Sequence, residues 1–421
     1  MLLSKHRLGS VPAKKRLRVF TFRICPTPEQ ESLLSRHAGC TRFVWNKALD
    51  LQKRRLEAGV PLLTYGDMAK LLTLWRESDE YGFLALAPSQ PQQQTLKNLD
   101  RAIREALDKK NPKRFSRFKR KDEKTSFLYP QGTKLDLGMT GPEWRTVLPR
   151  IFLPKVGWVK LRLSRQIEGE IKNVTVGERA GRWSVSVQTE REVPEPTTGI
   201  APEVGLDLGV ATFATLSDGT ILHPSSELLA RMKRAEERLS WEQRKLSRKY
   251  RKGAKSRNFA KQKRRLARAH ERVANMRLDF LHKTSTAISE TQAVVHVEDL
   301  KIRNMSRSAR GTVEAPGKKV RQKSGLNRSI LSRGWGIFLT LLGYKLSQNG
   351  GRLVRVPPQY TSQTCSVCSH VTPENRKTQE AFVCVACGHE ENADVNAAKN
   401  ILRAGQARSA CSEAKISESA A

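Results

Sequence analysis

Two Cys-x-x-Cys pairs near the C-terminal end of the chain constrain its fold more than any other feature. The first pair is Cys365 and Cys368, and the second, after fifteen intervening residues, is Cys384 and Cys387. Each pair can bring two thiolates to one ion, and two pairs complete a tetrahedron, so the spacing predicts a zinc ribbon that holds one Zn²⁺. Because four thiolates leave no open coordination position, the predicted zinc is structural and not catalytic.

The remaining cysteines, Cys25, Cys40 and Cys411, stand alone in the sequence. An odd number of cysteines without a recognisable secretory signal predicts metal ligation in a reducing compartment, not a disulfide framework. No apolar run approaches the ~18 residues of a membrane helix. The sequence therefore predicts a cytoplasmic protein with no membrane partner.

The charge of the chain indicates the class of its partner. Its 421 residues include 77 Lys and Arg but only 41 Asp and Glu, which gives a formal net charge of +36. An excess of this size causes self-repulsion unless a polyanion neutralises it. We therefore expect a nucleic acid as the partner.

The predicted elements change in character at a Pro-rich stretch, residues 193–203, where we place the main domain boundary. Before it, a strand at 16–24 precedes a helical region that begins after a Thr27 cap and continues to about 110, and residues 127–192 alternate like strands. After it, the order βββ-α-β-α-β-α predicts an RNase H-like fold with the cysteine segment inserted before the last helix. The elements in this order are three strands within 204–222, basic helices within 225–289, a strand at 293–300, a helix with Leu331, Trp335, Phe338, Leu342 and Leu346 on one face, a strand at 352–358 and a helix from about 394.

Acidic residues lie at the ends of two predicted core strands. Asp207 lies in an apolar strand near glycines, where a turn residue is the alternative interpretation. Glu298 ends a second apolar strand, where a charge on the surface rim is the alternative. Asp299 competes with Glu298, because strand alternation puts these two side chains on opposite faces and the pattern does not choose between them.

A third acidic residue, Asp394, lies at the start of the predicted last helix. It shares a helical spacing with Ala397, Ala398, Ile401 and Leu402, which predicts that its carboxylate lies on the inward face. Asn392 is available as a helix cap, but a capping or first-turn role for Asp394 is equally consistent with the sequence.

The three acidic residues acquire a common interpretation from the predicted order of elements. In an RNase H-like order, the first strand, the fourth strand and the last helix meet at one end of the sheet. Asp207, Glu298 and Asp394 can there hold two Mg²⁺ ions ~3.5–4 Å apart, which orient a water and stabilise the leaving oxygen of a phosphodiester. Carboxylate oxygens suit Mg²⁺ or Mn²⁺ better than zinc.

Five stretches of the chain resemble the TnpB family of transposon-encoded nucleases, compact relatives of the type V CRISPR effectors. They are GLDLGVATFATLSDG (205–219), VVHVEDLKIRNM (294–305), NRSILSRGWGIFLTLLGYK (327–345), PPQYTSQTCSVCSH (357–370) and CVACGHEENADVNAAKNIL (384–402). The resemblance extends over residues 16–403 and is most specific in the C-terminal half. The three nuclease motifs of the family match Asp207, Glu298 and Asp394, which favours Glu298 over Asp299.

The resemblance implies an RNA-guided DNA endonuclease. A guide RNA from the transposon end would pair with one strand of double-stranded DNA, and the protein would read a short, usually T-rich motif beside the target. A RuvC-like site with two Mg²⁺ would then cut both strands. The resemblance implies no small-molecule substrate and favours one monomer per RNA, in a prokaryotic cytoplasm and on the nucleoid when DNA is bound.

The resemblance also implies a domain plan in which a β-barrel wedge domain and a RuvC-like nuclease domain each carry an insert. Its parts are the first part of the wedge barrel (1–26), a helical recognition lobe (27–125), the second part of the barrel (126–195), the RuvC-like nuclease (196–359), a zinc ribbon that binds target nucleic acid (360–391), the last nuclease helix (392–404) and a flexible tail (405–421).

Polar and basic residues outside the carboxylate set are candidates for contact with nucleic acid. Amides that can read base edges are Gln90, Gln93, Gln94 and Asn98, for which a polar helix surface is the alternative. Phosphate-binding candidates are Lys113, Arg114, Arg117, Lys119, Arg120, Arg248, Lys249, Lys261, Arg264 and Arg265, for which a solvated amphipathic surface is the alternative. Phe115 and Phe118 either stack on bases or anchor the basic stretch in the core.

Other functions compete with guided cleavage. A structure-selective nuclease of the same fold, such as a junction resolvase, would not need the ribbon or the N-terminal 190 residues. A transposase would use a similar acidic triad but would also join DNA ends. An RNA-guided protein that binds without cutting is disfavoured by the intact triad.

Overall fold

The computed structural model describes residues 13–108, 110–121, 125–138, 148–194, 202–250, 256–376, 378 and 380–419. The chain divides into two compact units, Lys15–Glu192 and a second unit that consists mainly of Val193–Ala421. The division falls at the Pro-rich stretch, most of which lies outside the described residues. No helix in the described part of the chain has the length and apolar character of a membrane span.

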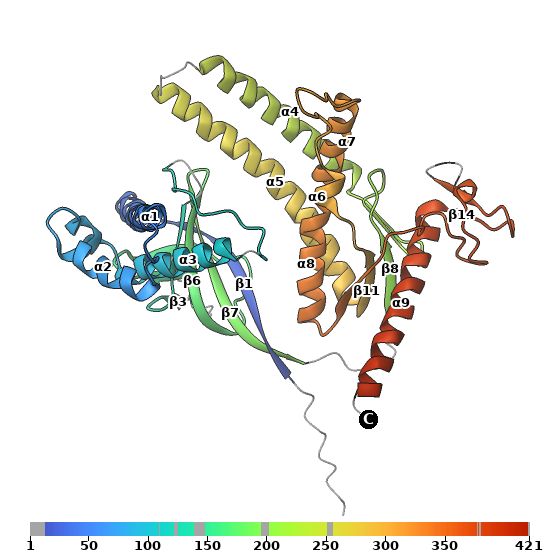
Figure 1. Cartoon of the computed structure of the whole chain (residues 1–421), viewed down its shortest axis with the longest axis horizontal. Helices are drawn as coiled ribbons and strands as arrows, with labels where there is room; N and C mark the ends of the chain where they lie inside the picture. The colour runs from blue at the N-terminus through green and yellow to red at the C-terminus, as the bar shows by residue number, and fades with distance from the viewer. Residues whose placement is uncertain are drawn as a thin grey trace, which may run out of the picture. The chain divides into compact units, whose positions relative to one another are not determined.

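The N-terminal unit combines a seven-stranded sheet with a helical insert between its first two strands (Figure 1). The strand order is β2-β6-β7-β1-β5-β4-β3, and no pairing between described strands closes it into the expected barrel. The elements are β1 (Ala13–Cys25), α1 (Pro28–Glu57), α2 (Tyr65–Glu77), the 3-10 helix η1 (Gly82–Leu86), α3 (Ser89–Leu107), β2 (Thr125–Tyr129), β3 (Lys134–Asp136), β4 (Arg150–Leu153), β5 (Gly157–Arg162), β6 (Glu170–Arg179) and β7 (Arg182–Pro194).

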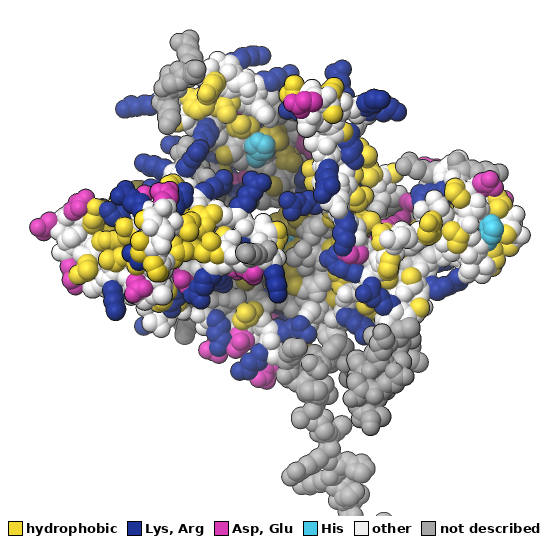
Figure 2. Space-filling model, in the orientation of Figure 1, with side chains coloured by type: hydrophobic (Ala, Val, Ile, Leu, Met, Phe, Trp, Pro, Cys, Tyr) yellow, Lys and Arg dark blue, Asp and Glu magenta, His cyan; other side chains and the backbone are white. Residues whose placement is uncertain are grey.

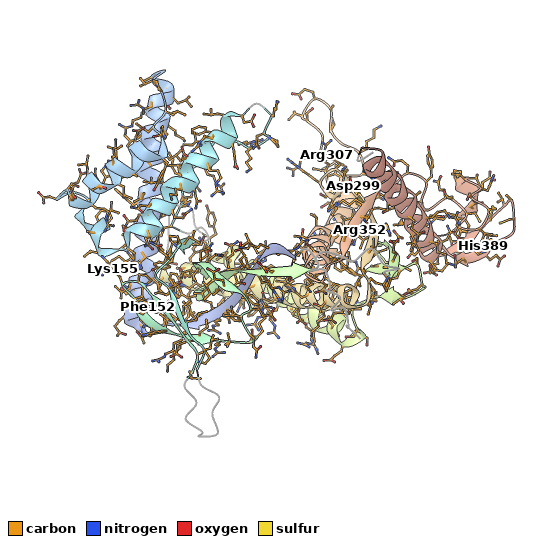
Figure 3. All side chains as sticks on the ribbon, turned by 90° about the horizontal axis from the view of Figure 1, so that it is seen from below. Phe152, Lys155, Asp299, Arg307, Arg352 and His389 are labelled. Atoms are coloured by element: carbon orange, nitrogen blue, oxygen red, sulfur yellow. The ribbon has the colours of Figure 1, made fainter. Side chains whose placement is uncertain are left out.

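The local sequence explains how this unit forms. Phe20, Phe22 and Ile24 alternate along β1 and are buried in the core of the sheet. The predicted cap of α1 is confirmed, because the Thr27 side chain accepts a hydrogen bond from the backbone of Gln30 and the Gln30 side chain accepts one from Thr27. Lys155, labelled in Figure 3, lies in the turn between β4 and β5. Its ammonium group donates to the Ala85 carbonyl at 2.7 Å and so ties the sheet to η1.

The C-terminal unit contains a five-stranded sheet of order β10-β9-β8-β11-β12. Strands β8, β11 and β12 run parallel, and β9 and β10 form an antiparallel edge beside β8. The elements are β8 (Glu203–Asp207), β9 (Ala214–Leu216), β10 (Ile221–Leu222), α4 (Ser226–Lys249), α5 (Arg257–Thr291), β11 (Val294–Glu298), α6 (Ile302–Met305), α7 (Val320–Arg333), α8 (Trp335–Gln348), β12 (Arg352–Val356), the 3-10 helix η2 (Pro373–Asn375), β13 (Ala381–Val383), β14 (Glu390–Asn392) and α9 (Ala393–Ser419).

Helices cover both faces of this sheet (Figure 1). On one face, Leu206, Val295 and Val297 pack into a core with residues of α5 and α8. On the other face lies α9, which meets the sheet at two glycines. A Cβ at Gly205 would lie 2.0 Å from the Ala398 carbonyl oxygen, so strand and helix backbones are nearly in contact there. Further along α9, a Cβ at Gly405 would lie 1.8 Å from Nδ1 of His296.

Two expectations about helices need correction. The helix predicted to carry Leu331 is two helices, α7 and α8, which separate at Gly334 with a φ of 72°. Leu331 is consequently 56% exposed, whereas Trp335 and the three later apolar residues of the stripe are buried. The last helix, expected to end at residue 404, continues as α9 through Ser419, and the sequence of this stretch contains no proline that would end it.

The close approach at Gly205 generates a stability prediction. We expect Gly205→Ala to lower the free energy of unfolding of the C-terminal unit by about 3 kcal/mol, because the added methyl group would meet the backbone of α9. Gly325→Ala is the matched control: nothing lies within 4 Å of its Cβ position in α7, and alanine favours a helix. Thermal unfolding of both variants measures the difference, and equal melting temperatures would contradict the packing argument.

Candidate functional site

Strands β8 and β11 bring two of the predicted acidic residues side by side. Leu206 pairs with Val297 in register, so the next residues along the parallel strands, Asp207 and Glu298, are neighbours at the end of the sheet. Alternation puts both on the same face as Gly205, which is the face covered by α9.

Asp394 joins them from the first turn of α9. The cap of this helix is Asn392, whose side-chain oxygen accepts from the backbone N–H of Asp394 at 3.0 Å and of Val395 at 3.2 Å. The Asp394 carboxylate is therefore not needed as the cap, and its Oδ1 lies 3.5 Å from the guanidinium of Arg376.

Burial raises the pKa values of all three carboxylates, and repulsion from the other two further raises that of Asp207. The pKa of Asp207 rises to about 7, mainly through burial and further through the charges of Glu298 and Asp394. Burial also raises the pKa of Glu298 and that of Asp394. The structure thus brings three carboxylates together in an environment where they repel one another.

Asp299 lies in a different environment from its neighbour. The carboxylate of Asp299, which is labelled in Figure 3, pairs with Lys301 and, at 3.2 Å, with Arg355. The hydrogen bond from Lys301 is the main reason that the pKa of Asp299 falls below its usual value. Asp299 therefore forms a surface ion pair, whereas Glu298 faces the carboxylate cluster.

Arg376 is a residue of this site that sequence reasoning missed. It lies in the insert between the two cysteine pairs, and its charge lowers the pKa values of Asp207, Glu298 and Asp394. In sequence Arg376 stands next to Lys377 in a polar stretch without periodicity, so no pattern distinguishes it. The only available signal is the general need of a carboxylate cluster for a cation.

Polar side chains connect the carboxylates to the cysteine segment. Thr361 donates a hydrogen bond to Glu298. From α9, Asn400 donates to the carbonyls of Thr361 at 3.0 Å and Thr364 at 2.6 Å. Asn396 donates to the same Thr364 carbonyl at 2.8 Å. One turn after another, α9 therefore holds the chain that leads into the first cysteine pair.

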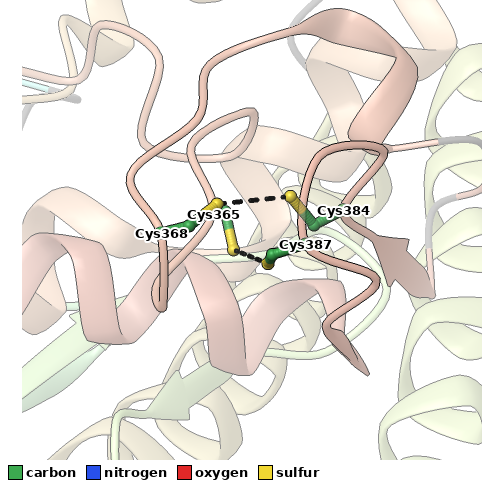
Figure 4. A group of neighbouring side chains, drawn as sticks. All are labelled: Cys365, Cys368, Cys384 and Cys387. Carbon is green, nitrogen blue, oxygen red and sulfur yellow. Dashed lines mark hydrogen bonds between the residues drawn. The ribbon is translucent and has the colours of Figure 1, made fainter.

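The four cysteines predicted to bind zinc form a compact cluster (Figure 4). Their sulfur atoms lie within 4.8 Å of one another, with Cys365 and Cys387 at 3.7 Å and Cys368 and Cys384 at 3.5 Å. A tetrahedral site with Zn–S bonds of ~2.3 Å has sulfur–sulfur edges of about 3.8 Å, so the cluster fits one zinc ion. Among the described residues, no histidine or carboxylate belongs to this cluster.

The amide candidates on α3 remain accessible. Gln93 and Asn98 are exposed, and Gln90 and Gln94 are half-buried. Gln94 donates to Asn98 at 3.3 Å. This surface is consistent with base contacts and equally with a polar helix face.

The basic candidates are all exposed, and they lie on two segments. Lys113, Arg114, Arg117, Lys119 and Arg120 lie on residues 111–120, which run along α1. Arg248, Lys249, Lys261, Arg264 and Arg265 lie on α4 and α5. Figure 2 shows Lys and Arg side chains widely over the helices, with fewer Asp and Glu.

Phe115 and Phe118 differ in the structure, although the sequence treats them alike. Phe115 packs against the helical core of the N-terminal unit and so anchors the basic segment 111–120 to that core. Phe118 is 43% exposed and lines a surface cavity.

The cysteine cluster predicts a specific loss of zinc. We expect Cys384→Ser to lose the single bound zinc and to lower the melting temperature of the C-terminal unit, because the ribbon contains few apolar residues that could replace the metal. Cys25→Ser is the control and should retain the metal, since Cys25 lies in β1. Zinc analysis of both purified variants decides the matter, and an unchanged metal content in the Cys384 variant would exclude the assignment.

The carboxylate cluster predicts a pH-dependent gain of stability in Asp207→Asn. The folded-state pKa of about 7 exceeds the ordinary 3.8, so the folded state binds this proton more tightly than the unfolded state does. Ionisation of Asp207 therefore lowers the free energy of unfolding. This destabilisation is absent below the ordinary pKa of 3.8, grows as pH rises and is complete above about pH 7.

In magnesium-free buffer, the melting temperature of Asp207→Asn should therefore exceed that of the parent by more at about pH 8 than at about pH 4. Asp299→Asn is the control and should show no such gain, because it removes a favourable ion pair. A gain that is the same at both pH values would contradict the repulsion argument.

Comparisons with known proteins support the resemblance. Residues 184–309 match a family model described as "Probable transposase", residues 335–401 match "Cas12f1-like, TNB domain", and residues 16–60 match "Helix-turn-helix domain". The chain is 47% identical to "Putative RNA-guided DNA endonuclease InsQ" of Escherichia coli (strain K12), over 95% of both chains. It is 34% identical to "Putative RNA-guided DNA endonuclease" of Streptomyces pristinaespiralis, over 94% of this chain and 91% of the relative.

Solved structures show a similar fold. A Cas12f1 complex with guide RNA and target DNA has a TM-score of 0.52 at 15% identity, over 89% of this chain and 83% of the Cas12f1 chain. The mini-RNA-guided endonuclease Cas_phi3 has a TM-score of 0.52 at 12% identity, over 94% of this chain and 93% of the other. The 47% identity to InsQ over 95% of both chains, together with the match to the transposase family model, confirms the family predicted from the motifs: the chain belongs to the TnpB family.

Proposed function

We propose that this protein is an RNA-guided, magnesium-dependent DNA endonuclease. The observation that carries the proposal is the meeting of Asp207, Glu298 and Asp394 at the end of one sheet, with their pKa values raised. The names of its full-length relatives support guidance by RNA. The strand order β10-β9-β8-β11-β12, with α9 across it, supports a RuvC-like nuclease of the RNase H-like class.

The donor set fits divalent magnesium. Three half-buried carboxylates supply hard oxygen atoms. Burial raises the pKa values of all three, and the charges of Glu298 and Asp394 further raise that of Asp207, a repulsion that a divalent cation would relieve. Asp207, Glu298 and Asp394 would hold the ions. When bound, the ions would activate a water and stabilise the leaving oxygen of the phosphodiester.

The protein's own residues prepare this site. Thr361 fixes the orientation of Glu298 through a hydrogen bond, and α9 fixes Thr361 through Asn400. Arg376 offsets part of the carboxylate repulsion, and its guanidinium can also bind a phosphate oxygen. A zinc ion held by Cys365, Cys368, Cys384 and Cys387 would keep the insert that carries Arg376 rigid.

The other parts of the chain receive proposed roles from the family. The seven-stranded sheet would be the wedge domain, the helices of residues 27–125 the recognition lobe, and residues 360–391 the insert that binds target nucleic acid. The exposed basic residues of α4, α5 and 111–120 would contact phosphates of the guide RNA and the DNA. The amides of α3 would read the flanking motif.

The proposal predicts a cleavage activity that depends on RNA and on Glu298. The purified protein with its co-expressed RNA should cut a matched duplex in Mg²⁺, and digestion of the RNA should abolish cutting. We expect Glu298→Gln to reduce the cleavage rate at least about 100-fold, because it would weaken the binding of the metal ions that stabilise the transition state.

Asp299→Asn is the matched control, since the adjacent carboxylate lies in a surface ion pair and should leave cleavage nearly unchanged. Binding of the matched duplex by the Glu298 variant should persist, because binding depends on pairing and phosphate contacts. Cleavage that survives RNA digestion would overturn the proposal in favour of a structure-selective nuclease. A Glu298 variant that cuts at the parental rate would exclude the proposed site.

A further inference from the structure

An open cavity of about 530 Å³ lies on the helical part of the N-terminal unit. Three phenylalanines form much of its wall: Phe43 of α1, Phe83 of η1 and Phe118 of the basic segment 111–120. The proposed cleavage chemistry uses none of these residues. A cavity of this size suits a small molecule or a single unit of a polymer.

The backbone on both sides of Phe118 is tied to α1. The indole nitrogen of Trp45 donates to the carbonyl of Arg117 at 3.1 Å. The side chain of Asn46 accepts from the backbone nitrogen of Lys119 at 2.8 Å and donates to the Lys119 carbonyl at 3.0 Å. Phe118 is nevertheless 43% exposed. The ammonium group of Lys53 in α1 lies over one face of its ring, 4.5 Å from the centroid, so the rest of the ring is an accessible surface on a fixed backbone.

A second exposed ring lines the same cavity. Phe83 is 43% exposed, and Phe43 supports it in an edge-to-face contact with a centroid distance of 5.2 Å. Two aromatic rings exposed in one cavity form contiguous apolar surface, which on a soluble protein often marks a ligand site. Both rings, like the other described residues that line the cavity, belong to the N-terminal unit.

The wall of the cavity is positively charged. Arg42 is half-buried and pairs with no acceptor among the residues that the structure describes. Lys47 donates to the hydroxyl of Tyr81 at 2.8 Å, which holds its ammonium group in place. The one acidic residue of the wall, Asp50, is paired with Arg54 at 2.9 Å.

We propose that this cavity binds one unpaired nucleotide. The base would stack on Phe118 and Phe83, and the phosphate would bind to Arg42 and Lys47. Exposed rings beside cations are the chemistry that recognises single-stranded nucleic acid, because every base has a face that can stack. A purely apolar ligand would leave the half-buried charge of Arg42 without a partner. The inference rests on the proposed function, in which guide RNA and a displaced DNA strand are the two sources of unpaired nucleotides.

Short oligonucleotides test the site in the full-length, zinc-bound protein. Fluorescence anisotropy would measure the binding of a five-nucleotide RNA and of its DNA counterpart at high salt, where phosphate contacts elsewhere weaken. We expect Phe118→Ala to weaken binding roughly tenfold, the effect of one lost base-stacking contact. Phe118→Trp should retain the binding affinity of the parent, because tryptophan keeps a ring on which a base can stack. Arg42→Gln should weaken binding. Arg36→Gln is the control, because it removes the same charge from an exposed position of α1 outside the cavity.

Each outcome decides the proposal. A loss for RNA alone assigns the site to the guide, and a loss for DNA alone assigns it to the displaced strand. The proposal would be overturned if the parent and Phe118→Ala bound both oligonucleotides with equal affinity. It would also be overturned if Arg36→Gln lost as much affinity as Arg42→Gln. Cleavage of matched DNA is measured separately in the same preparations. A parent that binds through Phe118 but does not cut contradicts only the proposed function, whereas a parent that cuts and a Phe118 variant that binds normally contradict only this site.

Discussion

The contact between the backbone of β8 at Gly205 and that of α9 at Ala398 is the constraint on which the carboxylate site depends. Because Gly205 has no side chain, the helix can lie directly on the strand, with its backbone where a Cβ would otherwise be. Gly405 repeats this arrangement over His296 further along the helix. Two contacts on one rigid helix determine both its height above the sheet and its direction. The first turn of α9, which carries Asp394, is thereby placed beside the ends of β8 and β11.

Helix α9 also determines where the cluster of four cysteines lies. Asn396 and Asn400 hold the backbone before the first cysteine pair, and Arg403 donates to Ser369 just after it at 3.0 Å. The described part of the cysteine segment has a small apolar cluster around Phe382, so a metal ion held by the four thiols would take the place of a hydrophobic core. The insert then returns Arg376 to the carboxylates. Helix α9 thus positions both the cysteine cluster and the carboxylate cluster.

The sequence predicted those features that depend on local spacing. Cys-x-x-Cys spacing predicted the cluster of four thiols, and strand alternation placed Glu298 and Asp299 on opposite faces without choosing between them. The choice depends on which face α9 covers, and that is a tertiary fact. Arg376 and Thr361 were missed for the same reason, because each acts through a residue far away in sequence. The break at Gly334 was missed because apolar periodicity continues through a glycine that has a positive φ.

The charge of the protein lies on its surface, whereas apolar residues form the core of each unit. Apolar residues are used inside each unit, and the exposed cations of 111–120, α4 and α5 have too few acidic neighbours to be neutralised within the protein. Such a surface is stable only with a polyanion or abundant counterions around it. Phosphate contacts alone would bind any nucleic acid equally. A fixed ring such as Phe118 adds a requirement for an unpaired base, and this requirement separates single-stranded segments from the duplex that the same cations would otherwise bind.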